Sequence, residues 1–341
     1  MIRPSDILAK ISETGLVGRG GAGFPTATKW AAVKDALKGK KPGYIIVNGA
    51  EGEPGVKKDG YLLKHYSAEV LDGVYLADLF LGPAKIKKIY IFLNFNYFKD
   101  HAPGIKKILE EKKYRLLREK IEFFIKPERL TYISGEESAL LNLIEGKRVE
   151  PRLRPPYPTE SGLHGRPTLI NNTETFYDIS LAVSGRYQEK RFYTVSGVVK
   201  HPGVYNLSTN LTVEEVLKQT NNMPVLPFFV QVGGEASGEV LGSDQLLRPV
   251  EGAGSIMVYD KELTNKHKLI RHWLQFYHEQ SCGQCTICRE GTYRLAEIID
   301  KKPFDHKLFW EIVAGLEDSS FCALGASLPI PLKSYFNNIK N

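Results

Sequence analysis

Residues 44–55 read YIIVNGAEGEPG and carry the clearest sign of an α/β fold in this chain. The run Tyr44–Asn48 predicts a strand, and the glycine-rich segment Gly49–Gly55 predicts the turn that ends it. On both sides of this strand, helical and extended patterns alternate. Helices are predicted over residues 6–14 (with Ser5 as cap), 29–37, 70–80 and 105–118, and a second strand over 86–93. This alternation predicts an α/β layer with a mainly parallel sheet.

The later part of the chain has a different pattern of predicted secondary structure. Residues 149–168 contain five prolines and predict a long extended loop, which in a compact domain is usually functional. From 192 to 259, short β-rich runs flank a helix predicted over Val213–Gln219, which favours a small β-grasp-like domain. After Lys261 the chain is predicted to be helical through His278 and then reaches the cysteines, so a helical C-terminal domain is expected.

Length and composition exclude several classes of protein. The chain has 341 residues, 42% hydrophobic and 25% charged, and these ordinary globular values exclude disorder, collagen-like repeats and a disulfide scaffold. The first residues do not read as a secretory signal, and no apolar run approaches the roughly 20 residues that a spanning helix needs. A cytoplasmic location is therefore expected, where thiols stay reduced and clustered cysteines usually bind metal.

The net charge of +7 is concentrated in one segment. Lys85–Lys126 contains twelve Lys or Arg and five Asp or Glu, so it alone carries +7. A solvated amphipathic helix is the favoured interpretation, and steering of an anionic partner or dinucleotide is the alternative. Nucleic-acid binding is not expected, because no recognition module accompanies the charge.

All four cysteines lie in the last sixty residues. Two-residue gaps separate Cys282, Cys285 and Cys288, and Cys322 follows at a distance. Thiolates at this spacing can surround one small cluster and take a fourth ligand from elsewhere in the fold, which favours a [4Fe–4S] cluster. A four-cysteine zinc site is the main alternative, although such sites more often use two C-x-x-C pairs. Inert buried cysteines are the third interpretation. An iron–sulfur cluster passes single electrons and therefore implies a redox partner.

A glycine-rich loop, Gly18–Gly23, matches the pattern G-x-G-x-x-G. The ordinary dinucleotide fingerprint requires a strand directly before it, whereas the preceding residues are predicted to be helical. A glycine backbone that leads into a helix near Lys29 is still a suitable phosphate cradle. A tight turn without a ligand is the alternative.

Six motifs follow one another along the chain. They are Gly18–Trp30 (GRGGAGFPTATKW), Asn48–Gly55 (NGAEGEPG), Tyr132–Leu140 (YISGEESAL), Pro151–Pro158 (PRLRPPYP), Asn171–Glu174 (NNTE) and Ser281–Thr292 (SCGQCTICREGT). Together they resemble the flavin- and NADH-binding subunit of respiratory complex I and the related diaphorase subunits of NAD-linked hydrogenases and formate dehydrogenases. The resemblance implies FMN, NAD(H) and one [4Fe–4S] cluster. It also implies three domains: a modified Rossmann-like FMN domain over 1–188, a ubiquitin-like (β-grasp) domain over 189–262 and a helical bundle with the cluster over 263–341.

The resemblance also implies roles for individual residues. The flavin would be lined by Gly18, Arg19, Gly20, Gly21, Ala22, Gly23, Lys29, Asn48, Glu51, Tyr132, Gly135 and Glu136, with Asn171, Asn172 and Thr173 at its phosphate and ribityl chain. The nucleotide would be contacted by Phe24, Glu53, Glu137, Arg154 and Tyr157, and the cluster by Cys282, Cys285, Cys288 and Cys322. A carboxylate such as Glu137 accepts hydrogen bonds from ribose hydroxyls and repels a 2′-phosphate, which favours NAD over NADP. A helix N-terminal turn without a ligand is the alternative for Glu136 and Glu137.

The chain departs from the family pattern at several positions. Ala50 replaces one flavin-site carboxylate, and Ala32 replaces a second aromatic against the adenine, a loss of about 1 kcal/mol. Milder changes are Arg154 for Lys, Tyr157 for Phe, Ser134 for a non-ligand cysteine and Gly60 for Arg. The flavin site is therefore expected to be intact in its main parts, and the NADH site is expected to make fewer contacts with its ligand.

The expected function is that of an NADH dehydrogenase (diaphorase)-type flavoprotein, the electron-input subunit of a larger oxidoreductase. NADH would give a hydride to FMN, and electrons would pass singly through the cluster to a partner, with no residue needed as general acid or base. The expected partners are a thioredoxin-like [2Fe–2S] subunit and further redox subunits, in a complex that is cytoplasmic or peripheral to a membrane. The alternative is a non-catalytic flavin and iron–sulfur relay or docking subunit that takes electrons from another donor such as ferredoxin.

Overall fold

The computed structural model describes residues 3–39, 41–128 and 132–339. The chain divides into two compact units. The first unit comprises Met1–Glu51 and Lys58–Glu189, and the second comprises Gly52–Lys57 and Lys190–Asn341. The division into three domains at 188/189 and 262/263 stays a prediction, and its outer limits, residues 1 and 341, lie outside the described residues.

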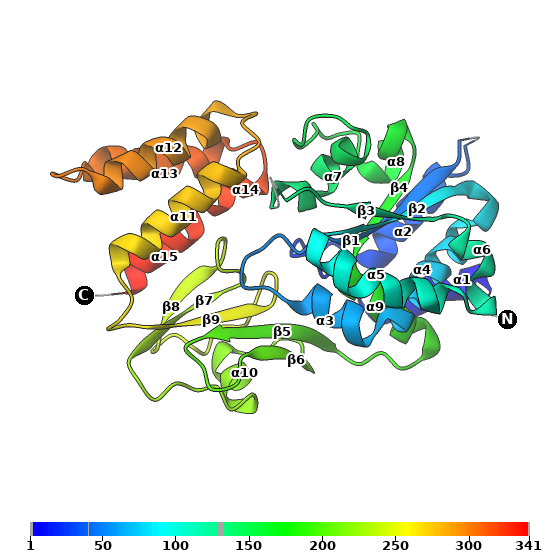
Figure 1. The fold of residues 1–341 in the computed structure, drawn as a ribbon, viewed down its shortest axis with the longest axis horizontal. Helices are drawn as coiled ribbons and strands as arrows, with labels where there is room; N and C mark the ends of the chain where they lie inside the picture. Colours follow the sequence, from blue (N-terminus) through cyan, green and yellow to red (C-terminus); the bar gives the residue numbers. More distant parts are fainter. Residues whose placement is uncertain (1–2, 40, 129–131, 340–341) are drawn as a thin grey trace. The chain divides into compact units, whose positions relative to one another are not determined.

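The first unit is built on a four-stranded parallel sheet with the order β3-β2-β1-β4 (Figure 1). Its strands are β1 (Gly43–Gly49), β2 (Ile86–Leu93), β3 (Ile121–Ile125) and β4 (Thr168–Asn172). The predicted parallel sheet is confirmed. So are the two predicted strands, of which the first extends one residue further at each end. β1 is buried along almost its whole length, as a central parallel strand should be.

Helices cover both faces of this sheet. On one face, Ile46, Phe92 and Ile170 pack against Leu140 and Leu141 of α7 (Glu137–Ile144). The other face lies against α4 (Ser67–Leu81) and α5 (Phe95–Leu109). The remaining helices of the unit are α1 (Pro4–Glu13), α2 (Thr26–Ala36), α3 (Lys58–His65), α6 (Arg115–Arg118), α8 (Pro158–Ser161) and α9 (Thr173–Ser184). Short 3-10 turns lie at Pro83–Lys85, Lys112–Tyr114, Ile133–Gly135 and Leu163–Gly165.

Several predicted details of the helices were wrong. α1 begins at Pro4 and is preceded by Arg3, so Ser5 lies inside the helix and does not cap it, because proline is favoured at the first helical position. α2 begins at Thr26, ahead of the predicted start. The helix expected over 105–118 is the end of α5, a 3-10 turn and α6. The loop expected over 149–168 contains α8 and a 3-10 turn and ends in β4.

The second unit contains a five-stranded sheet with the order β6-β5-β9-β7-β8 (Figure 1). The strands are β5 (Lys190–Gly197), β6 (Gly203–Ser208), β7 (Phe228–Val232), β8 (Glu239–Gly242) and β9 (Ser255–Asp260). Only the central pair, β5 with β9, is parallel among the described pairings. Helix α10 spans Val213–Gln219, as predicted, and buries Val213, Val216 and Leu217 in the core of this sheet.

Five helices follow the sheet in the second unit: α11 (Lys266–Gln280), α12 (Thr286–Asp300), α13 (His306–Ser319), α14 (Ala323–Ser327) and α15 (Pro329–Asn338). α15 is tied to β8, because Ser334 Oγ accepts from Val240 N at 2.9 Å and Asn338 Nδ2 donates to Val240 O at 2.7 Å. Among the described residues, no helix has both the length and the apolar character needed to cross a membrane.

Candidate functional site

The carboxyl ends of β1 and β4 mark the place where a ligand is expected in the first unit. After β3 the chain crosses the sheet and adds β4 on the far side of β1. Ligands of open α/β sheets bind at such a switch point, outside the carboxyl ends of the strands. Asn48 of β1 and Asn172 of β4 are paired in register. Two motifs that are far apart in the sequence therefore meet at one sheet edge.

The glycine loop is an exposed turn that leads into α2. Gly18 N donates to Phe24 O at 2.8 Å, and residues 20–25 are exposed between this contact and the helix. The helix α1 precedes the loop, so its context differs from that of a dinucleotide fingerprint, as predicted. The bare backbone next to a helix N-terminus is suited to an anion.

Arg19 anchors this loop through its buried side chain. Its Nε donates to Asp178 Oδ2 at 2.9 Å, and its backbone N–H donates to Thr175 Oγ1 at 3.0 Å. Burial, and then the charge of Glu174, raises the pKa of Asp178 to about 7, while Arg19 acts in the opposite direction. The structure therefore places the Arg19 guanidinium against α9 and leaves the exposed backbone of the loop for a ligand.

Two buried hydroxyls in this unit have no hydrogen-bond partner among the described residues: Oγ1 of Thr26 and Oγ1 of Thr173. Each is the first residue of a helix, α2 or α9, where backbone N–H groups are unsatisfied and the helix dipole is positive. A buried polar group without a partner costs about 1–3 kcal/mol. Both positions fit an anionic ligand with oxygen atoms, such as the phosphate and ribityl chain of FMN.

The Asn172 amide is fully occupied by protein groups. Its Oδ1 accepts from Lys58 Nζ and Glu174 N, both at 3.0 Å, and its Nδ2 donates to Asp59 Oδ2 at 2.7 Å and to Asn48 O at 3.2 Å. An amide has two donors and two acceptor positions, and all four are used here. Asn172 therefore caps α9 and fixes the end of β4, and its side chain has no capacity left for a ligand.

Asn171 is also held by protein groups. In the amide orientation that satisfies its neighbours, its oxygen accepts from Trp30 Nε1 and its nitrogen donates to Ile170 O, both at 2.9 Å. Of the three residues predicted at the flavin phosphate, Thr173 is thus the one that presents an unused polar side chain.

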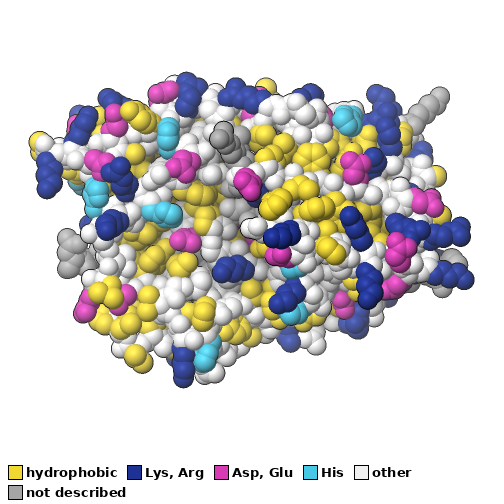
Figure 2. Space-filling model, viewed as in Figure 1, with side chains coloured by type: hydrophobic (Ala, Val, Ile, Leu, Met, Phe, Trp, Pro, Cys, Tyr) yellow, Lys and Arg dark blue, Asp and Glu magenta, His cyan; other side chains and the backbone are white. Residues whose placement is uncertain are grey.

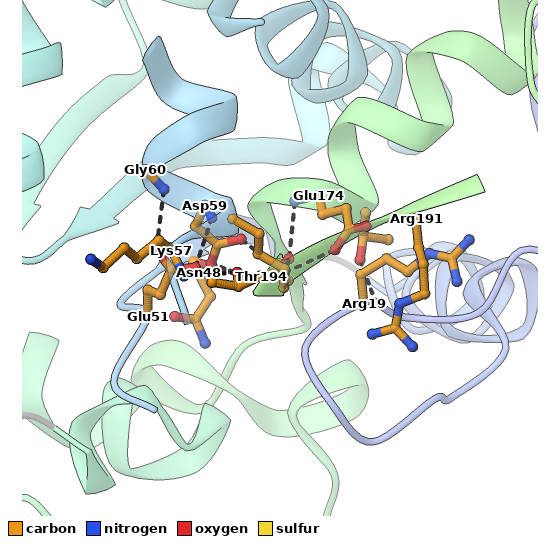
Figure 3. Close-up of polar contacts among 12 residues, drawn as sticks. Arg19, Asn48, Glu51, Lys57, Asp59, Gly60, Glu174, Arg191 and Thr194 are labelled. Carbon is orange, nitrogen blue, oxygen red and sulfur yellow. Dashed lines mark hydrogen bonds and ion pairs between the residues drawn. The ribbon is translucent and has the colours of Figure 1, made fainter. Parts of the chain in front are cut away.

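A cluster of buried charges lies behind this edge (Figure 3). Lys58 Nζ contacts Asp59 Oδ1 at 2.9 Å and Glu174 Oε2 at 3.0 Å. Glu51 accepts from Asp59 N at 2.7 Å and Gly60 N at 3.2 Å, so its carboxylate caps α3. Burial, followed by the charge of Asp59, raises the pKa of Glu51 to about 7, while Lys58 opposes the shift.

The partners of Glu51 were missed by sequence reasoning, although the charged run Lys57–Asp59 directly after the glycine-rich turn was a usable signal. Tyr97, from α5, donates its hydroxyl to Glu51 Oε2. A Cβ atom at Gly60 would lie 2.6 Å from the Tyr97 ring. The departure from the family pattern at Gly60 therefore makes room for Tyr97.

The predicted residues Tyr132, Gly135 and Glu136 lie around a 3-10 turn beside β1. Asn48 Nδ2 donates to Gly135 O at 2.8 Å and so ties this turn to the strand end. Glu136 is the N-cap of α7: its Oε2 accepts from Ser138 N at 3.0 Å and Ala139 N at 2.9 Å. Its other oxygen, Oε1, accepts from Arg154 Nη2, so Glu136 both caps the helix and pairs with a cation, and its role toward the flavin stays a prediction.

Glu137 lies between two cations. Its Oε2 is 3.3 Å from Lys29 Nζ and its Oε1 is 3.2 Å from Arg154 Nη2. Lys29 also lies 5.9 Å above the Phe24 ring, which is half exposed, as is Tyr157. These groups offer exposed aromatic rings and paired charges of both signs. Ala32, where the family pattern has an aromatic, lies on α2.

Glu53 belongs to the second unit, as part of the segment Gly52–Lys57. Its Oε1 accepts from Ala236 N at 2.9 Å and Ser237 N at 3.1 Å, and its Oε2 from Ser237 Oγ at 3.0 Å. Glu53 therefore binds the loop between β7 and β8 within the second unit, and its predicted contact with the nucleotide stays a prediction.

The four cysteines lie in the second unit, Cys282 in the loop between α11 and α12 and the other three at the starts of two helices. Cys285 directly precedes α12, Cys288 lies in its first turn, and Cys322 directly precedes α14. Burial raises the pKa of the Cys288 thiol to about 11, with the neighbouring cysteines adding to the shift and a contact from Ser281 Oγ at 3.3 Å opposing it. The thiols are therefore close enough to act on one another electrostatically.

The surroundings of the four thiols have two features that suit a bulky cofactor. Beside the thiols, the buried Ser320 Oγ has no partner in the described chain, and a Cβ atom at Gly325 would lie 3.3 Å from Cys288 Cβ. An unused donor and a close backbone suit a bulky cluster of sulfide and iron.

The basic segment Lys85–Lys126 is partly neutralised by its own neighbours. Four of its cations pair with carboxylates: Lys88 with Glu122, Lys113 with Asp72, Arg118 with Glu110 and Lys120 with Asp78. On the face seen in Figure 2, Lys and Arg side chains are spread out and interleaved with Asp and Glu. These contacts favour the solvated interpretation for most of the segment. Lys126, in contrast, is buried.

Comparisons with known proteins agree with this division of sites. A family described as the Nuo51 FMN-binding domain matches residues 11–181, and one described as the NADH-ubiquinone oxidoreductase-F iron-sulfur binding region matches residues 268–341. The chain is similar to the F subunit of NADH-quinone oxidoreductase from Aquifex aeolicus (32% identity, 95% of this chain and 82% of the relative) and from Mycobacterium tuberculosis (30%, 99% and 84%). It is also similar to a chain of an NAD+-reducing [NiFe]-hydrogenase in its H2-reduced state, with a TM-score of 0.87 and 30% identity over 98% of this chain; it spans 61% of that hydrogenase chain.

Proposed function

We propose a function on the premise that this chain belongs to the family of NADH-quinone oxidoreductase F subunits. The proposed function is that of an NADH dehydrogenase-type flavoprotein subunit, which accepts electrons from NADH at bound FMN and passes them through a [4Fe–4S] cluster to a partner protein. FMN, when bound, supplies the link between two-electron and one-electron chemistry. The protein binds and orients both cofactors and excludes water from them.

The observation that carries the flavin site is the unpartnered, buried hydroxyl of Thr173 at the N-terminus of α9. The exposed backbone of residues 20–24 and the Lys29 ammonium would complete a phosphate site around it. Asn171 and Asn172 would act by holding Thr173 in position, because their amides are bound by Trp30, Lys58 and Asp59.

The nucleotide would bind where Phe24 and Tyr157 are half exposed and Glu137 lies between Lys29 and Arg154. A ribose diol could take the place of Arg154 on Glu137, and the displaced Arg154 could then face the pyrophosphate while Lys29 stays at the flavin phosphate. Because Ala32 offers no second ring, we expect weak adenine stacking and a high KM for NADH.

The metal centre would be a [4Fe–4S] cluster on Cys282, Cys285, Cys288 and Cys322. Support comes from their proximity, from the unused Ser320 hydroxyl and from the close backbone at Gly325. Iron and acid-labile sulfide analysis of the anaerobically purified protein is the test. We expect about four of each per chain, and zinc without sulfide would overturn the assignment.

We also propose the finer architecture that the sequence predicted. The order β6-β5-β9-β7-β8, with a parallel central pair and α10 between β6 and β7, supports a ubiquitin-like β-grasp domain. Helices α11 to α15 support a cluster-carrying bundle after it. The predicted division into 1–188, 189–262 and 263–341 would follow.

The proposed partners are a thioredoxin-like [2Fe–2S] subunit and further redox subunits of a cytoplasmic or membrane-peripheral complex. The relatives are named as subunits, which supports assembly with other chains. Purification of the native complex, followed by identification of its chains, tests this proposal.

The decisive experiment adds NADH anaerobically to the protein reconstituted with FMN, iron and sulfide. We expect the flavin absorbance near 450 nm, a general property of oxidised flavins, to bleach within seconds at about millimolar NADH. Bleaching by NADPH at the same rate would contradict the role given to Glu137. No bleaching by NADH would contradict the function itself.

A non-catalytic relay that takes electrons from ferredoxin is the second candidate, and the alanines at positions 32 and 50 favour it. It predicts that reduced ferredoxin bleaches the flavin whereas NADH does not. Running both donors on one preparation separates the two functions.

A further inference from the structure

Lys126 is a buried lysine at the sheet edge where the proposed flavin residues gather. It directly follows β3, and its backbone N–H donates to Leu93 O at 2.7 Å. Its ammonium donates to Ala50 O at 2.9 Å, and the residue is only 3% exposed. A positive charge is thus held inside the protein at the carboxyl ends of β2 and β3.

Ala50 lies among residues that the proposed function assigns to the flavin. Its N–H donates to Asn48 Oδ1 at 3.2 Å, and a Cβ atom at Gly135 would lie 3.3 Å from its own Cβ. The Lys126 ammonium is therefore one hydrogen bond away from the backbone that joins Asn48 to Glu51. Ala50 also stands where the family resemblance predicts a carboxylate. Compared with the family pattern, this edge therefore lacks a carboxylate at position 50, and it holds the buried ammonium of Lys126.

We propose that Lys126 sets the reduction potential of bound FMN by placing a buried positive charge beside it. The inference rests on the proposed function. A hydride from NADH brings two electrons and one proton and leaves NAD+, so the flavin gains one negative charge until a second proton follows. A fixed cation in a low-dielectric site favours this more electron-rich form. Charge near the flavin ring is a general means by which proteins tune its potential.

The neighbouring charges leave this effect in place. Among the described groups, Glu51 has a carboxylate whose field acts on Lys126, and it is held by Asp59 N, Gly60 N and the Tyr97 hydroxyl. Because burial raises the pKa of Glu51 to about 7, its negative charge is incomplete near neutral pH. Burial also lowers the pKa of Lys126 to about 8, so the ammonium is still mostly charged at pH 7.

The test is the midpoint potential of FMN in the reconstituted holoprotein, measured by anaerobic spectroelectrochemical titration at pH 7. Lys126→Gln keeps a donor for Ala50 O and removes the charge, and Lys126→Arg keeps the charge. We expect the Gln variant to have a lower midpoint potential of FMN. At a fixed potential, its ratio of reduced to oxidised flavin should fall about tenfold, which corresponds to about 30 mV for a two-electron couple. The Arg variant should stay close to the wild type.

Lys34→Met is the matched control. Lys34 is also a lysine that donates to main-chain carbonyls, Phe80 O at 2.6 Å and Leu81 O at 3.0 Å. These carbonyls end α4, ahead of β2 and therefore at the opposite edge of the sheet. This variant should leave the potential unchanged.

The outcomes separate the inference from the function on which it rests. If wild-type protein binds FMN and is bleached by NADH but the Gln variant keeps the wild-type potential, the inference is wrong and the function stands. A wild type that binds no FMN contradicts the function itself. If the Gln variant does not retain FMN, Lys126→Met is measured in its place, and a potential equal to that of the Arg variant again overturns the inference.

Discussion

Thr173 and Asn172 are neighbours in the chain but use their polar groups in different ways. The Asn172 amide makes four hydrogen bonds within the protein, whereas the buried Thr173 hydroxyl has no partner in the described chain. A protein that leaves such a group unsatisfied is less stable by about 1–3 kcal/mol than one that satisfies it. A substitution that removes the Thr173 hydroxyl should therefore weaken ligand binding without lowering the stability of the apoprotein.

Replacing Thr173 by Val should weaken FMN binding about tenfold, because one hydrogen bond to the ligand is worth about 1.4 kcal/mol or less. The same change should leave the apoprotein as stable or more stable, since it removes an unsatisfied hydroxyl. FMN fluorescence quenching and urea unfolding measure the two effects. The control is Thr220→Val, where Oγ1 donates to Val216 O at 2.8 Å. That variant should lose about 1 kcal/mol of stability and keep its FMN affinity.

Glu51→Gln should change how stability depends on pH. Burial raises the pKa of Glu51 from 4.5 to about 7, so the folded protein holds this proton more tightly than the unfolded chain does. The resulting stabilisation is full below the unfolded pKa and is lost as pH rises through about 7. The amide that replaces the carboxyl does not titrate. The variant should therefore gain stability relative to wild type, by about 1–3 kcal/mol, between pH 5 and pH 8.

Urea unfolding of both apoproteins at the two pH values gives this difference directly. Groups that do not interact with Glu51 titrate alike in both proteins and cancel, whereas Asp59 and Lys126 are coupled to its charge and belong to the measured difference. An equal gap between variant and wild type at pH 5 and pH 8 would show that Glu51 titrates at an ordinary pKa.

At the scale of elements, the sequence predicted best where local pattern and packing agree. The strand at β1 and the helix α10 carry uninterrupted patterns, and both were predicted closely. The single helix expected over 105–118 was wrong. The apolar spacing continues past the end of α5, but a tertiary contact interrupts the helix there. Tyr114 is buried and its hydroxyl contacts Asp72 Oδ1 at 2.8 Å, which holds a turn between α5 and α6. No local pattern carries that information.

The contact between α4 and α9 depends on a glycine. A Cβ atom at Gly73 in α4 would overlap the backbone carbonyl of Phe176 in α9, and a backbone cannot rotate away as a side chain can. Gly73→Ala should therefore destabilise the protein by about 2 kcal/mol or more, even though alanine favours a helix by about 1 kcal/mol. Gly104 in α5 has no atom within 4 Å of an added Cβ. Gly104→Ala should be stabilising by about 0.5–1 kcal/mol.

Thermal unfolding of the two alanine variants tests this pair. A Gly73→Ala protein as stable as Gly104→Ala would mean that the two helices move apart without cost.

At the scale of the whole molecule, the two proposed redox sites belong to different units. The flavin residues of the first unit were predicted from motifs, and the cysteines of the second from their spacing. Lys58, Asp59 and Tyr97, which surround Glu51, were not predicted, because their role depends on contacts across the fold. The contacts of Glu53 with Ala236 and Ser237 were not predicted either, and its role toward NADH stays a prediction.

Cys288→Ser should therefore remove one site and leave the other. We expect iron and sulfide content to fall and electron transfer to a [2Fe–2S] partner to drop by about two orders of magnitude or more, since the one-electron route is interrupted. Bleaching of the flavin by NADH should continue. Iron analysis and stopped-flow absorbance measure the two results. Loss of FMN from this variant would show that the sites depend on one another.

The segment Gly52–Lys57 has a consequence for how this gene can change. It leaves the first unit after β1, takes its contacts from the second, and returns to the first at α3, so the two units are joined at three points along the chain. A recombination event at residue 189 would separate Gly52–Lys57 from the contacts of Glu53 with Ala236 and Ser237, so neither product would keep them. Shuffling of modules at this boundary is therefore disfavoured, and the two halves should be inherited together.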